Sequence, residues 1–215
     1  MGATWFRRAA DLPGLGYAAP QPVDATRLRG YGAEPELSRR EDFEGKTVES
    51  LHWSYDDGEE PYGTSASPAQ NHASAAYELE LSSAARLQHL WETLELPGQA
   101  GDYHFAIQDT AGDMWRRKRK EPTMLAWAEW LCWLDIRVIR AWPDAVRDEH
   151  AADFEDRSEF YGVTAFRTLA QLYKREGFLT EAQQVAEVAR SFDQGGPYID
   201  DVEEKLAALR AEDGG

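Results

Sequence analysis

The residues best suited to chemistry lie in an acidic run near residue 150. The run comprises Asp148, Glu149, His150, Asp153, Glu155 and Asp156. Carboxylate oxygens and an imidazole nitrogen could ligate a divalent metal, but the run lacks the ligand spacing and turn glycine of a calcium loop. Residues 56–60 fail the same pattern, and the other four histidines, at 52, 72, 89 and 104, are scattered along the chain. We therefore predict no metal ligands and no cofactor.

Three tryptophans form a second group with potential chemistry. Trp127, Trp130 and Trp133 lie three residues apart and could stack on a sugar or a cofactor ring. At helical spacing, such a stripe is more typical of a hydrophobic core. Glu129 and Asp135 lie on the same predicted helix but project about 120° apart, so they would not easily face one substrate as a glycosidase pair.

Enzyme motifs are otherwise missing. The sequence has no Gly-x-Ser-x-Gly elbow, no phosphate-binding glycine loop before Lys-Ser/Thr, no His-Glu-x-x-His and no Cys-His arrangement. The single cysteine, Cys132, cannot form an internal disulfide and lies in an apolar stretch typical of a core. We predict no catalytic residues.

A basic run at residues 116–120 could bind nucleic acid or act in nuclear import. Cations near the end of a helix are also favoured by its dipole, which is the simpler interpretation. The formal net charge of the chain is −16, which opposes binding to polyphosphate and to anionic membranes. We therefore exclude nucleic acid and membrane surfaces as partners.

The distribution of this charge is uneven. Residues 1–82 carry a net charge of −7, residues 83–148 carry −1 and residues 149–215 carry −8. The most apolar window, residues 124–142, contains four charged side chains, which a bilayer span would not readily carry. Arg7 and Arg8 are followed by Ala-Ala-Asp-Leu-Pro-Gly, not by the apolar run of a signal peptide. We expect a cytoplasmic protein.

Hydrophobic periodicity divides the chain into an N-terminal arm, residues 1–82, and a helical domain, residues 83–215. The arm is rich in glycine, proline and charge, and we expect one short helix at residues 4–10. Alternating patterns at residues 47–55 and 77–81 predict a two-stranded β element, and residues 56–74 between them are turn-rich.

From residue 83 onward the pattern is helical. Ser82 is a candidate N-cap for a first helix that stops at Pro97-Gly98. Further helices are expected at residues 103–118, 122–141, 144–152 and 158–176, then from 180 to about 192 and from 200 to about 211. Gly177 is placed to end the fifth of these helices in the left-handed conformation, and Thr180 and Gln183 have the spacing of a capping box.

One segment has the residue pattern of a known helical hairpin. Phe166, Leu169, Ala170 and Tyr173 mark its first helix, and the second carries small residues twelve and nineteen positions after Ala170. Over residues 160–193 this segment resembles a tetratricopeptide repeat, a 34-residue helix–turn–helix unit. Two departures are the small Ala186 and a Pro197 that comes about three residues late. A degenerate second copy is suggested by Gly112, Trp115 and Ala126 or Ala128.

The resemblance implies a fold class and a mode of action. The fold class is mainly α, with antiparallel α-α hairpins stacked as a short tetratricopeptide-like bundle. In such proteins the first helix of each repeat lines a peptide-binding groove. The groove-facing positions here would be Thr164, Arg167, Gln171 and Lys174. Arg167 and Lys174 could bind a carboxylate by charge-assisted hydrogen bonds.

The preferred functional prediction is a non-enzymatic protein-binding module, either an adaptor or an acidic inhibitor of the immunity type that acts on a basic partner. In that reading Glu149, Asp153, Glu155 and Asp156 would contact lysine or arginine on the partner. Two alternatives remain open. One is an enzyme with a metal-assisted site near His150, and the other is a structural homodimer joined through surplus tryptophans.

Overall fold

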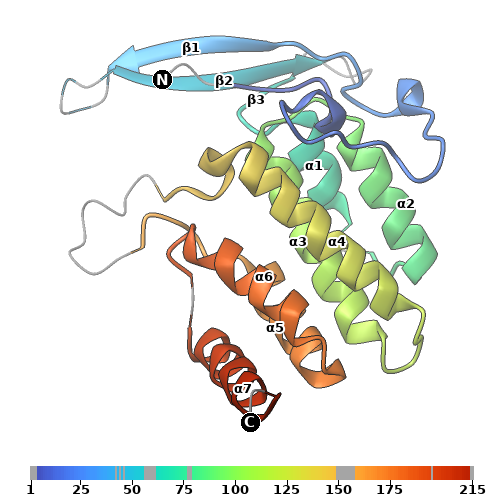
Figure 1. Cartoon of the computed structure of the whole chain (residues 1–215). Coiled ribbons are helices and arrows are strands. Elements are labelled where there is room, and N and C mark those ends of the chain that lie inside the picture. Colours follow the sequence, from blue (N-terminus) through green and yellow to red (C-terminus); the bar gives the residue numbers. More distant parts are fainter. Residues whose placement is uncertain are drawn as a thin grey trace. The chain divides into compact units, whose positions relative to one another are not determined.

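The structure is a computed structural model of the whole chain (Figure 1). It describes residues 4–41, 43, 45, 47–55, 62–76, 79–148, 158–194 and 196–213. These residues form a mainly helical fold with a small antiparallel sheet in the N-terminal region, which confirms the predicted fold class at this level. Within the described residues, no helix has both the length and the apolar character that a membrane crossing requires.

Residue contacts divide the chain into two compact units. Unit 1 comprises Met1–Thr110 and Arg137–Ala145, and unit 2 comprises Ala111–Ile136 and Val146–Gly215. The division falls inside two long helices, α3 (Ala100–Arg117) and α4 (Met124–Ala141). It does not follow the boundary predicted between residues 82 and 83, because the helix that begins at Ser83 belongs to the same unit as the N-terminal segments.

The sheet of unit 1 has three antiparallel strands in the order β1-β2-β3. They are β1 (Pro35–Glu41), β2 (Thr47–Tyr55) and β3 (Tyr62–Thr64). The predicted strand at residues 47–55 is confirmed, but its partners were not foreseen. The second predicted strand is wrong for residues 79–81, which form no strand, and residues 77–78 lie outside the described chain. The first strand escaped prediction because it is mostly exposed and lacks an alternating apolar pattern.

Aromatic packing anchors the sheet to the N-terminal segment. Trp53 of β2 is fully buried, and the Trp5 ring meets its ring edge-on, with centroids 5.7 Å apart. Phe6 also pairs with Gly98 through two backbone hydrogen bonds of 2.8 and 3.0 Å. The arm therefore has its own buried contacts, although its regular helix is limited to the short turns η1 (Ala9–Asp11) and η2 (Ala25–Arg27).

Two capped helices follow in unit 1. Helix α1 (Pro68–Ala75) begins after Ser67, whose Oγ accepts a hydrogen bond from the Gln70 backbone N–H, and it has proline at its first position. This helix was not predicted. Helix α2 (Ser83–Leu94) begins after Ser82, whose Oγ accepts from the Ala85 N–H, as predicted. The two helices pack against each other.

Helices α3 and α4 run close to their predicted bounds. In α4 the fully buried positions include Leu131, Leu134 and Asp135. The expectation that the tryptophan stripe is core is wrong, because Trp127, Trp130 and Trp133 are all only half-buried. The helix predicted at residues 144–152 is a short turn, η3 (Pro143–Val146), in its described part.

The remaining helices belong to unit 2 (Figure 1). They are α5 (Thr164–Glu176), α6 (Leu179–Arg190) and α7 (Pro197–Asp213), and α6 packs on both α5 and α7. Gly177 ends α5 with φ +83° and donates its N–H to the Tyr173 carbonyl, as predicted. The capping box at Thr180 is wrong, since α6 begins after Phe178 without a side-chain cap. Helix α7 begins at Pro197, three residues early, because proline fits the first helical position.

Two glycine substitutions should change stability in opposite directions. Gly177→Ala should lower the free energy of unfolding by about 1 kcal/mol, because alanine is strained at positive φ. Gly112→Ala in α3 should raise it by about 0.5–1 kcal/mol, because a Cβ there meets only Arg116 Nη1 at 3.6 Å and alanine favours the helix. Urea unfolding monitored by circular dichroism checks both, and effects of the same sign would contradict the assigned conformations.

Candidate functional sites

The exposed face of α5 carries the residues predicted to contact a partner. Thr164, Arg167 and Gln171 are exposed and follow one another at the spacing of a single helix face. The opposite side of α5 is buried through Ala165, Phe166, Leu169, Ala170, Leu172 and Tyr173. The apolar positions thus hold α5 in unit 2 and leave a polar stripe in contact with solvent.

The fourth predicted contact residue, Lys174, already has a partner within the chain. Its Nζ pairs with the Asp201 carboxylate on α7, and Lys205 lies 3.6 Å from the other oxygen of that carboxylate. The hydrogen bond from Lys174, together with the charge of both lysines, lowers the pKa of Asp201. Lys174 therefore joins α5 to α7, which the sequence did not indicate.

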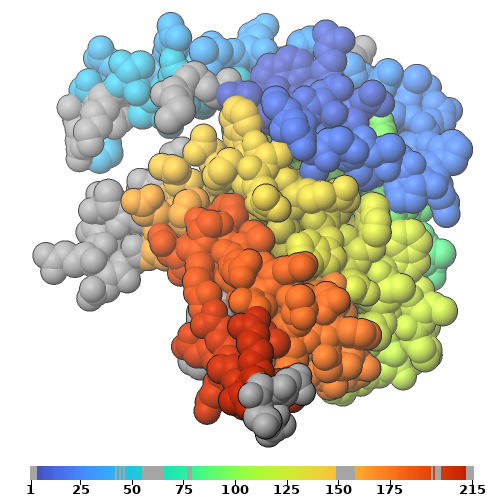
Figure 2. All heavy atoms as spheres, in the orientation of Figure 1, coloured from blue at the N-terminus to red at the C-terminus, as the bar shows by residue number. Residues whose placement is uncertain are grey.

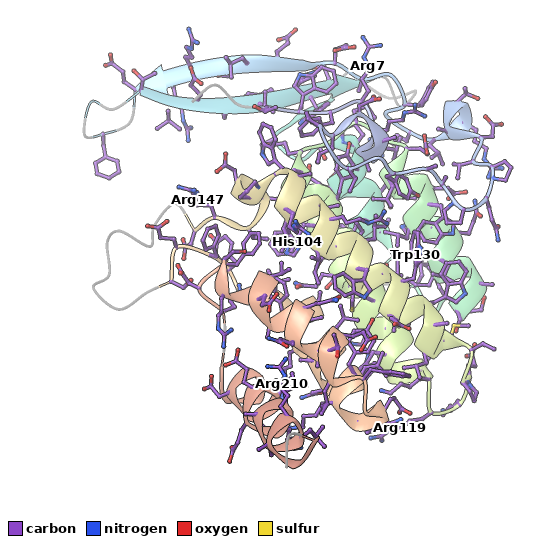
Figure 3. All side chains as sticks on the ribbon, in the orientation of Figure 1. Arg7, His104, Arg119, Trp130, Arg147 and Arg210 are labelled. Carbon is purple, nitrogen blue, oxygen red and sulfur yellow. The ribbon has the colours of Figure 1, made fainter. Side chains whose placement is uncertain are left out.

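Arg167 differs from the neighbouring cations. Arg175 pairs with Glu176 at 2.9 Å, and Arg190 pairs with Glu203 at 2.7 Å. In the described chain, Arg167 and the exposed Arg210 of α7, which Figure 3 labels, have no ion pair. Arg167 is thus the cation on the predicted contact face that has no anion of its own.

A hydrogen-bonded triad lies on the buried side of α5. The Tyr173 hydroxyl donates to Glu129 Oε1 at 2.6 Å and accepts from Trp133 Nε1 at 2.7 Å. Burial and the hydrogen bond to Glu129 raise the pKa of Tyr173 to about 12. Glu129 and Trp133 of α4 therefore take part in a packing contact, which explains why this polar side of α4 is half-buried.

The basic run at residues 116–120 makes contacts within its own helix end. Asp113 lies 3.4 Å from Arg116 and 2.9 Å from Arg117. The Lys118 ammonium lies 3.3 Å from the centroid of the Trp115 ring and donates to the Trp115 carbonyl at 2.8 Å. These contacts agree with cations that cap the end of α3.

Unit 1 brings together two histidines that the sequence analysis treated as scattered. The rings of His72 on α1 and His89 on α2 stack with centroids 4.0 Å apart and an interplanar angle of 15°. Glu92, one turn after His89, lies beside them, with Oε2 at 3.8 Å from His72 Nε2. Burial, with a smaller effect of His89, lowers the pKa of His72 to about 4, and burial also lowers the pKa of His89.

The sequence indicated the α2 part of this cluster but not His72. His89, Glu92 and Thr93 have the i, i+3 and i+4 spacing that places side chains on one helix face. His72 lies 17 positions earlier, in a segment interpreted as turns, so nothing indicated that it would reach that face. The one local signal for this helix is Ser67-Pro68, an N-cap residue followed by proline at the first helical position.

Unit 1 also contains two hollows that share an ion pair in their lining. Their volumes are about 470 and 450 Å³, and Arg8, Val23 and Glu95 line both. Arg8 lies 3.5 Å from Glu95, and Arg7 pairs with Glu34 at 3.3 Å, so the lining mixes both signs of charge. Because the cations of the lining pair with its carboxylates, the hollows favour neither anionic nor cationic ligands.

The acidic residues predicted to meet a basic partner lie outside the described chain. These are Glu149, Asp153, Glu155 and Asp156, and His150 of the alternative metal site lies there too. The buried Cys132 is described, and burial raises the pKa of its thiol, which disfavours a thiolate nucleophile.

Comparisons of the chain with protein-family models, with curated proteins and with solved structures found no match in any of the three. The function of the chain is therefore inferred from its own side chains and their contacts.

Loss of the Tyr173 hydroxyl should destabilise unit 2. Tyr173→Phe leaves Trp133 Nε1 and Glu129 Oε1 without their partner, which should cost about 1–3 kcal/mol in the free energy of unfolding. Tyr161→Phe is the matched control, because that tyrosine is 41% exposed. Urea unfolding of both variants checks the prediction, and equal midpoints for the two would show that the triad contributes no stability.

Proposed function

We propose that the chain is a non-enzymatic protein-binding module and that the exposed face of α5 forms part of its contact surface. The observation that carries this proposal is the state of Arg167. It is exposed, it has no ion pair within the described residues, and it lies one helical turn from the exposed Gln171. A guanidinium can bind a carboxylate through two parallel hydrogen bonds, and a neighbouring amide can bond the peptide backbone.

The tetratricopeptide-like character of α5 and α6 supports this choice of surface. The two helices pack against each other as a hairpin around Gly177, and their small residues Ala170, Ala182, Ala186 and Ala189 are buried. Small side chains allow close approach of the helices, as the resemblance implies. If the hairpin functions as such a repeat, α5 is the helix that faces the peptide, and Thr164, Arg167 and Gln171 lie on its solvent side.

The partner contributes a carboxylate to this face. Lys174 adds positive charge at the end of the stripe, but its pairing with Asp201 reduces what it offers to a partner. Figure 2 shows α5, α6 and α7 adjacent to one another at the surface in orange and red. A partner carboxylate near Lys174 would compete with Asp201, whereas one near Arg167 would meet no competing anion from the described residues.

In the inhibitor version of this function, the acidic chain binds and blocks a basic protein. This version is supported by the net charge of −8 over residues 149–215, which would attract a basic protein and speed its association at low salt. The homodimer alternative is less favoured, because none of the eight tryptophans, all described, is among the exposed large apolar side chains.

A charge reversal on α5 tests the proposed contact. A partner obtained by native co-purification should bind Arg167→Glu about 10- to 100-fold more weakly than the wild type, because a charge-assisted hydrogen bond is worth about 1.5–3 kcal/mol. Isothermal titration calorimetry at one fixed salt concentration measures the affinities.

Arg210→Glu provides the matched control, since this arginine is also exposed, unpaired in the described chain and helical. It should change the affinity by less than about twofold if the contact is local. Equal losses in both variants would mean that only net charge matters, and no loss in Arg167→Glu would remove α5 from the interface.

A further inference from the structure

The stacked histidines and Glu92 converge as a set of metal ligands. Each residue offers one ligand atom, and the three atoms lie within 4.8 Å of one another. In the part of the chain that the structure describes, this is the one group of three or more His, Cys, Asp or Glu residues with that property. All three side chains are half-buried, and they come from two helices, α1 and α2, that pack together in unit 1.

Hydrogen bonds select the tautomer of each imidazole. The Thr93 hydroxyl donates its single proton to the His89 carbonyl at 2.9 Å, so it must accept the 2.9 Å hydrogen bond from His72 Nδ1. The lone pair of a neutral His72 is therefore on Nε2. His89 Nε2 lies 2.7 Å from the His72 carbonyl, which only accepts, so the lone pair of a neutral His89 is on Nδ1.

This arrangement matches the outer shell of metal sites. Histidines that bind metals normally donate the N–H of the other ring nitrogen to a carbonyl or another oxygen, which fixes the tautomer and the ring orientation. Here the buried Thr93 and the His72 carbonyl take those two roles. Glu92 is also held, because Oε1 accepts from Arg27 and Gln88 at 3.1 Å each.

The atoms that these hydrogen bonds leave over are two acceptors that face each other. Glu92 Oε2 faces His72 Nε2 at 3.8 Å, and in the neutral tautomer both atoms are acceptors. Two facing acceptors repel each other, and a metal ion between them would bind both. A histidine binds a metal ion through the lone pair of its neutral imidazole.

We propose that His72, His89 and Glu92 bind a first-row divalent transition-metal ion, for which Zn²⁺ is the best-matched probe. Two imidazole nitrogens and one carboxylate oxygen suit Zn²⁺, whereas Mg²⁺ and Ca²⁺ prefer oxygen ligands throughout. Three protein ligands leave a fourth position for water in tetrahedral coordination.

Binding requires a local change that can be observed. Imidazole lone pairs lie in the ring planes, and the two planes are nearly parallel at 15°. One ion can meet both lone pairs only if at least one ring turns about its side-chain bonds. His72 Nδ1 donates to Thr93 and His89 Nε2 donates to the His72 carbonyl, and both hydrogen bonds limit that turn. The change should therefore stay within the two histidines and Glu92.

Calorimetric titration of the full chain with ZnCl₂ tests the site after EDTA treatment and dialysis. At pH 7.5 we expect one Zn²⁺ per chain with a micromolar or lower Kd, and no comparable heat with MgCl₂. His72→Gln and His89→Gln should each weaken binding by at least about 10- to 100-fold, the range for loss of a single outer-shell partner. His52→Gln is the matched control, because His52 is exposed on β2, and it should leave the Kd unchanged.

Nuclear magnetic resonance of the ring nitrogens locates the ion even if a variant fails to fold. Zn²⁺ should shift His72 Nε2 and His89 Nδ1 in the wild-type chain and leave His52 unshifted. The proposal is overturned if no ion binds, if His52→Gln weakens binding as much as His89→Gln, or if the shifted resonances belong to His150. Because this site lies in unit 1, its failure would not alter the α5 interface tested with Arg167→Glu.

Discussion

A polar group that leaves water must keep a hydrogen-bond partner, and this requirement sets the side-chain positions in both sites. In unit 2, the Tyr173 hydroxyl uses its proton on Glu129 and its lone pair on Trp133. In unit 1, the Thr93 hydroxyl uses its proton on a carbonyl and its lone pair on His72. Each buried hydroxyl thus fixes one hydrogen-bond acceptor and one donor beside it. A residue without the same donor or acceptor could not replace either neighbour without leaving a buried polar group unpaired.

Charged side chains of unit 2 also find partners within the unit. Four of the six cations of α5, α6 and α7 pair with a carboxylate of unit 2, so the acidity of this region is partly neutralised from within. Exposed pairs of this kind contribute little stability, but they decide which charges a partner meets. Arg167 and Arg210 lack such a pair within the described residues, and of the two only Arg167 lies on the predicted contact face. In the proposed metal site, the unpaired feature is instead two acceptors that face one another.

Much of the helical layout could be predicted because its signals are local. Ser82 caps α2 and Gly177 ends α5 through contacts within four residues, so the sequence pattern contains the whole interaction. Two predictions from local patterns fail: residues 79–81 form no strand, and α6 begins after Phe178 rather than after the polar cap expected at Thr180. A strand also needs a pairing partner, which an alternating pattern does not contain.

By itself, the sequence determined a mainly helical chain, its acidic balance, the ends of several helices and the polar stripe of α5. Only the tertiary structure decided that Lys174 pairs with Asp201, that the tryptophans of α4 are half-buried, and that His72 stacks on His89. Helix periodicity orients residues within one element, whereas the ion pair and the histidine stack join residues on different helices that are 17 or more positions apart. Their formation depends on how helices pack, and that information is spread over many side chains rather than held in a motif.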